Sequence, residues 1–132
     1  MPAGSPVVLD ASALVAYARD EPGARIVSAR LRSNGRVLVS AVNWAEAAGK
    51  LREYRMTPAI LRQALAAVET VIVAFAEADA DDVGALTPRR RLLGVSLGDR
   101  ACPALALSAT ALTADQSWSR LDLDGLVVEL IR

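Results

Sequence analysis

Four acidic residues stand where their side chains could perform chemistry together. Asp10 and Asp115 each follow a short apolar run, whereas Glu46 and Asp99 lie near the starts of predicted helices. Two carboxylates about 4 Å apart repel each other by about 4 kcal/mol at an effective dielectric constant of about 20, so a cluster of carboxylates favours a bound cation. Carboxylate oxygens suit Mg²⁺ or Mn²⁺, which also leaves room for a substrate phosphate. The four acids therefore predict a divalent metal site for cleaving a phosphodiester bond.

The elements that must position these acids follow an alternating pattern. Short apolar runs, the predicted strands, lie at 7–9, 37–39, 71–73, 111–113 and 126–130. The predicted helices lie at 11–18, 22–32, 41–55, 58–68, 77–86 and 99–109. This alternation predicts one α/β domain over residues 1–132, with a mainly parallel sheet, helices on both faces and a loose tail at 1–5. Ligands of such sheets bind beyond the carboxyl ends of the strands, the edge that all four acids can reach.

The helix predicted at 41–55 carries Glu46, and Ser40 is suited to cap it. Its periodicity predicts two faces. The apolar face is expected to hold Ala41, Trp44, Ala45, Ala48 and Leu51, and the polar face Asn43, Glu46 and Lys50. Of the two tryptophans, Trp44 is therefore expected in the core, while Trp118 is a candidate for stacking on a base.

Composition excludes several classes of site. The sequence has no His and a single Cys, Cys102, so it has neither an internal disulfide nor the ligands of a usual zinc site. Cys102 is expected to be a buried residue that packs as a small apolar side chain. A lone Cys also indicates a reducing compartment, so the protein is expected in the cytoplasm. No run approaches the roughly 18 apolar residues of a membrane span, and the first residues do not form a signal peptide. The formal net charge is zero, so no overall basic field indicates a nucleic-acid partner.

Each acid also has a purely structural interpretation. Asp10 and Asp115 could cap the turns that follow them, and Asp99 could close a capping box with Ser96. Glu46 could form an exposed ion pair with Lys50. A phosphate-handling receiver domain is disfavoured, because it needs adjacent acids after its first strand and a late lysine, and Lys50 is the only lysine.

Four strings of residues carry a resemblance to a known family: 7–14 (VVLDASAL), 40–46 (SAVNWAE), 96–102 (SLGDRAC) and 112–118 (LTADQSW). In this order they resemble the PIN-domain family, and within it the VapC-type ribonuclease toxins of bacterial toxin–antitoxin pairs. The resemblance spans essentially the whole chain. It implies a three-layer α/β/α sandwich with a central parallel five-stranded sheet, and Mg²⁺- or Mn²⁺-dependent endonucleolytic cleavage of RNA by an activated water.

The resemblance also assigns roles to residues and partners. Asp10, Asp99 and Asp115 are the expected metal ligands, and Glu46 completes the acidic pocket. Supporting positions beside these acids fall to Ser12, Asn43 and Thr113. The family further implies a homodimer and a cognate VapB-type antitoxin that covers the acids, with the helices at 22–32 and from 41 as walls of its groove.

Basic residues near the third motif could grip the RNA backbone. These are Arg89, Arg90, Arg91 and Arg100. One departure from the family pattern is Pro103, which would kink a helix that begins at Ser96 but would cost little in one that begins near Asp99. It is the one feature that favours the alternative function, a catalytically silent PIN-like module that binds RNA or protein.

Overall fold

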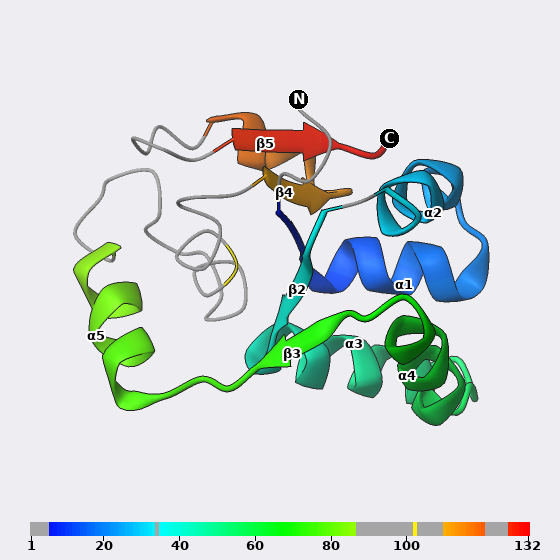
Figure 1. The fold of residues 1–132 in the computed structure, drawn as a ribbon, viewed down its shortest axis with the longest axis horizontal. Helices are drawn as coiled ribbons and strands as arrows, with labels where there is room; N and C mark the ends of the chain where they lie inside the picture. The colour runs from blue at the N-terminus through cyan, green and yellow to red at the C-terminus, as the bar shows by residue number, and fades with distance from the viewer. Residues whose placement is uncertain (1–5, 34, 87–101, 103–109, 121–126) are drawn as a thin grey trace.

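The computed structural model describes residues 6–33, 35–86, 102, 110–120 and 127–132. Its helices and strands alternate along the chain, as the apolar pattern predicts (Figure 1). In order they are β1 (Val7–Leu9), α1 (Ala11–Arg19), α2 (Ala24–Leu31), β2 (Val37–Ser40), α3 (Ala41–Glu53), α4 (Pro58–Ala67), β3 (Val71–Val73), α5 (Glu77–Leu86), β4 (Thr110–Thr113), the 3-10 helix η3 (Gln116–Arg120) and β5 (Val127–Leu130).

The strands form one five-stranded sheet in the order β3-β2-β1-β4-β5. Every pairing is parallel, with Val7 of β1 opposite Val37 of β2 and Thr110 of β4. Parallel neighbours need a crossover between them, and the helices between consecutive strands supply it. The predicted α/β fold with a central parallel five-stranded sheet is therefore confirmed.

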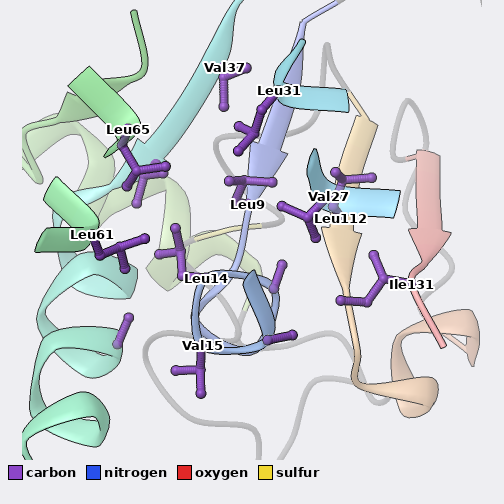
Figure 2. Packing of buried hydrophobic residues seen from close by; sticks show 14 of the residues in the cluster. Leu9, Leu14, Val15, Val27, Leu31, Val37, Leu61, Leu65, Leu112 and Ile131 are labelled. Carbon is purple, nitrogen blue, oxygen red and sulfur yellow. The ribbon is translucent and has the colours of Figure 1, made fainter. Parts of the chain in front are cut away.

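One face of the sheet carries the main hydrophobic core. Side chains alternate along a strand, so Val7 and Leu9 of β1 point to this face while Val8 points to the other. Figure 2 shows Leu9 and Leu112 of the sheet packed among Leu14 of α1 and Val27 of α2. The cluster also includes Ala47 and Leu51 of α3 and Leu61 and Leu65 of α4. This packing fixes α1 and α3 beside β1, the central strand that Asp10 follows.

The opposite face has a smaller cluster of Val8, Ala111, Cys102 and Trp118. Cys102 is helical and fully buried, which confirms its expected place in the core. The expectation for Trp118 was wrong: only 1% of it is exposed, so the ring has no face for a base. Apart from Cys102, the helix predicted at 99–109 lies outside the described residues, as does the tail at 1–5.

Two details of the predicted helices are corrected. The second helix begins at Ala24 rather than Pro22, because Gly23 takes a left-handed backbone with φ +98° immediately before it. On α3 the buried side chains are Asn43, Ala47, Ala48 and Leu51, whereas Ala45 is exposed and Trp44 is half-buried. Small alanines defined the apolar face poorly, so the predicted face differs from the observed one by about one residue. The cap was right, since Ser40 Oγ accepts a hydrogen bond from Val42 N at 3.2 Å.

Within the described ranges, no helix is long and apolar enough to cross a membrane.

Candidate metal centre

A cavity of about 390 Å³ lies at the carboxyl edge of β1 and β4. It brings together Asp10, Glu46 and Asp115, three of the four acids singled out in the sequence. Its lining consists of Asp10, Ala11, Ser12, Val15, Glu21, Glu46, Lys50, Tyr54, Asp115 and Arg132. The cavity thus joins the ends of two strands to one side of α3.

Asp10 is the most tightly held of these acids. It is 3% exposed and caps α1, because its Oδ1 accepts a hydrogen bond from Ala13 N at 2.8 Å. The hydroxyl of Ser12 donates to the same oxygen at 2.7 Å, and that of Thr113 donates to Oδ2 at 2.5 Å. A buried carboxylate requires such donors to stay charged. Asp10 therefore both caps α1 and lines the cavity.

The donors to Asp10 are themselves fixed by the backbone of the chain after β4. Ser12 Oγ accepts a hydrogen bond from Ala114 N at 2.9 Å and lies 3.2 Å from Thr113 Oγ1. Thr113 Oγ1 also accepts from Asp115 N at 3.0 Å. One hydrogen-bonded network therefore runs from the carboxylate of Asp10 to the backbone of Asp115.

Asp115 and Glu46 reach the cavity from separate elements. Asp115 Oδ1 accepts from both the backbone N and the hydroxyl of Ser117, at 2.9 and 2.7 Å, and so caps η3. Its Oδ2 accepts no hydrogen bond from the part of the chain that the structure describes. Glu46 is exposed on α3. The ion pair considered for Lys50 forms with another acid, Glu53, at 3.3 Å.

The donor set has the right chemistry for a hard divalent ion, since carboxylate oxygens dominate it. Among the described residues, however, no three acidic or sulfur-bearing side chains are grouped closely enough to hold a metal ion. The fourth predicted acid, Asp99, lies outside those residues. Asp10, Glu46 and Asp115 alone therefore make an acidic cavity, and a complete metal site needs a further ligand.

Comparison with known families decides the wider assignment. The PIN domain family matches residues 7–123, which covers most of the chain and all four acids. The chain belongs to the PIN-domain family. A comparison with curated proteins gave no match.

Two solved structures share the fold of this PIN domain. One is the VapBC2 complex from Rickettsia felis bound to a DNA fragment from its promoter, with a TM-score of 0.69 and 16% identity over 95% of this chain and 98% of that chain. The other is a toxin–antitoxin complex from Klebsiella pneumoniae, with a TM-score of 0.69 and 17% identity over 92% of this chain and 95% of that chain. At identities this low, the structural match shows that the fold is shared and nothing more.

Five predicted site residues of the PIN domain lie outside the described residues: Asp99, Arg89, Arg90, Arg91 and Arg100. Pro103, the departure from the family pattern, lies outside them as well. Asn43 is described and is 1% exposed, but it does not line the cavity. Its supporting role stays a prediction, as do the roles of the other site residues.

The polar lining that sequence reasoning did not assign to the site consists of Lys50, Glu21, Tyr54 and Arg132, although Lys50 was expected on the same helix face as Glu46. Glu21 lies in the turn after α1 and is paired with two arginines, with Arg19 Nη1 at 2.5 Å and Arg132 Nη1 at 3.4 Å. Arg19 also stacks over the ring of Tyr54, 3.5 Å from its centroid. No periodic pattern connects a turn, a helix end and the second residue after β5, so the sequence carried no signal for this wall. Tyr54 alone could have been found, because it stands eight residues after Glu46, on the same side of a helix.

Proposed function

We propose that this PIN domain is a metal-dependent endoribonuclease that acts as the toxin of a toxin–antitoxin pair. The observation that carries the proposal is the cavity shared by Asp10, Glu46 and Asp115, which come from three separate parts of the chain. Caps and exposed ion pairs explain each acid singly. They do not explain why all three face one concave site at the edge where ligands of parallel sheets bind.

Mg²⁺ or Mn²⁺ would be held by Asp10, Asp99 and Asp115, with Glu46 completing the acidic pocket. Such an ion makes bound water easier to deprotonate and stabilises charge on phosphoryl oxygens. The chain's own contribution is to hold the ligands still. Ser12, Thr113 and the amide of Ala13 fix the carboxylate of Asp10, and Ser117 fixes one oxygen of Asp115. Residues that orient ligands in this way support metal affinity.

The fold neighbours support a partner. Both are complexes named as VapBC or toxin–antitoxin assemblies. By analogy with these complexes, the proposal includes a VapB-type antitoxin as partner. A homodimer, an RNA substrate and a cytoplasmic location belong to the proposal through the resemblance to VapC-type toxins alone.

The test is cleavage of RNA by the purified chain, free of any partner, with Mg²⁺ or Mn²⁺ and with a chelator as control. Asp10→Asn and Asp99→Asn should abolish metal-dependent cleavage. Asp81→Asn is the matched control, because Asp81 is an exposed acid on α5 that does not line the cavity.

Cleavage that needs the metal, survives Asp81→Asn and disappears in the other two variants supports the proposal. Cleavage that persists with the chelator or in both site variants contradicts it. RNA binding without any cleavage or metal uptake would favour the silent binding module instead.

A further inference from the structure

Three side chains one helical turn apart line the acidic cavity, two of them from α3 and the third from its C-cap residue. Glu46, Lys50 and Tyr54 are spaced four residues apart, and all three belong to the lining. Residues at this spacing lie on one side of a helix, about 6 Å apart along its axis. They present, in order, a carboxylate, an ammonium group and an aromatic ring, and the last two lead away from the acids.

Two weak contacts hold Lys50 in place, an ion pair with Glu53 and a cation–π contact in which its Nζ lies 5.9 Å from the centroid of the Tyr54 ring. Its ion pair with Glu53 joins side chains that are 54% and 69% exposed. Ion pairs this exposed are worth little, so a phosphate can take the place of Glu53. Lys50 and Arg132 are the basic residues among those that line the cavity.

Tyr54 is held by neighbouring side chains and is still partly exposed. It is 44% exposed, and its ring lies against the guanidinium of Arg19. Arg19 is fixed in turn by its ion pair with Glu21. A ring that is already held in place loses little entropy when a base stacks on it.

The wall beside Tyr54 does not repel a phosphate chain. Its acid, Glu21, is paired with both Arg19 and Arg132. The negative charge of Glu21 is therefore balanced within this wall, away from Asp10, Glu46 and Asp115, where a cation is expected.

We propose that Lys50 and Tyr54 form a track on which a single strand of RNA leaves the acidic site, with Lys50 binding a phosphate beside the cleaved bond and Tyr54 stacking on an unpaired base. The inference rests on the proposed function, because the acids define where the strand starts. A cation next to an exposed ring is the usual means of holding single-stranded nucleic acid. Paired bases keep their faces stacked on one another, so the track selects unpaired RNA.

The test measures binding and not turnover. All variants are made in the Asp115→Asn background, and a short fluorescent single-stranded RNA is titrated at several salt concentrations. Lys50→Met should weaken binding about fivefold and lower the slope of log affinity against log salt by about 0.7, the value for one phosphate contact of a single strand. Tyr54→Leu should weaken binding about tenfold, and Tyr54→Phe should leave it within about twofold.

Arg52→Met is the matched control for charge. Arg52 is an exposed cation on the same helix and does not line the cavity, so the salt slope should stay unchanged. An RNA with an abasic site opposite the ring should bind wild type as weakly as intact RNA binds Tyr54→Leu.

Equal losses for Lys50→Met and Arg52→Met, or equal affinity for single-stranded and fully paired RNA, would overturn the track. Failure of the nuclease proposal would be seen separately, as an absence of metal-dependent cleavage by the protein with native Asp115. Binding data remain interpretable in that case, because they require no turnover.

Discussion

Thr113 donates a hydrogen bond of 2.5 Å to Oδ2 of Asp10, although the two residues are 103 positions apart in the sequence. Parallel pairing explains the contact. Leu9 of β1 lies opposite Leu112 of β4, so the next residue on each strand reaches the carboxyl edge together. Thr113 is fully buried and Asp10 nearly so. The contact links the sheet register directly to the first acid of the cavity.

Thr113→Val should therefore affect both stability and metal binding. Valine keeps the shape of threonine but removes a donor to a buried carboxylate, so the free energy of unfolding should fall by about 2 kcal/mol. Metal affinity should fall about 10- to 100-fold, because Asp10 is less firmly oriented. Urea denaturation and titration calorimetry measure the two effects. Thr113→Ser retains the hydroxyl and should behave like wild type in the calorimetry; a Ser variant as impaired as the Val variant would contradict this role.

Metal binding should also stabilise the fold. A ligand that binds only the folded state, at 100 times its Kd, raises the free energy of unfolding by about 2.7 kcal/mol. The free energy of unfolding of the wild type should rise by about this much in Mg²⁺ at 100 times its Kd, and a chelator should remove the increase. Asp115→Asn should keep its stability without metal, because asparagine can also accept from Ser117 N, but should lose the gain.

Asp81→Asn, on the exposed side of α5, controls for the removal of a charge and should keep the full gain. Identical unfolding curves of wild type with Mg²⁺ and with chelator would argue against any metal site in this cavity.

Sequence patterns predicted the sheet well because its strands are short apolar runs between helices. All five strands appear within one or two residues of their expected bounds. The face of α3 was less predictable. A polar residue, Asn43, is buried there, while Ala45 is exposed, and hydrophobicity alone cannot distinguish a buried alanine from an exposed one.

Some residues of the cavity could likewise be predicted from the sequence, and others could not. Asp10 and Asp115 could be placed at one edge because each follows a strand of a parallel sheet. The positions of Glu21 and Arg132 could not be predicted, because the turn after α1 and the second residue after β5 meet only through the tertiary fold. Their contact at 3.4 Å depends on how β5 packs beside α2.

The Ser40 cap sets where α3 begins and hence where Glu46 faces the cavity. Ser40→Ala removes the acceptor for Val42 N and should lower the free energy of unfolding by about 1 kcal/mol. Thr57→Ala is a matched control at the start of α4, because the side chain of Thr57 makes no capping hydrogen bond and should be nearly neutral on removal. Chemical denaturation of both variants compares them. Equal losses at the two positions would mean that the hydroxyl of Ser40 contributes nothing specific.

Gly23 lies two residues after Glu21, at the start of α2, and packs against Ile131, the residue after β5. Its φ of +98° disfavours any side chain, and a Cβ at this position would lie 2.6 Å from the carbonyl oxygen of Ile131. Gly23→Ala should therefore lower the free energy of unfolding by about 2 kcal/mol or more. It should also displace the neighbouring turn that holds Glu21, and so loosen the ion pair with Arg132.

Gly49→Ala gives the opposite expectation with the same chemical change. Gly49 is an exposed residue within α3, and a Cβ there meets nothing within 4 Å. Alanine should raise the free energy of unfolding by about 0.8 kcal/mol, because it favours the helix over the unfolded chain. Urea denaturation of the two variants beside wild type decides the matter: midpoints that shift in the same direction would contradict the backbone argument for Gly23, whereas opposite shifts attribute its effect to the left-handed turn and the contact with Ile131.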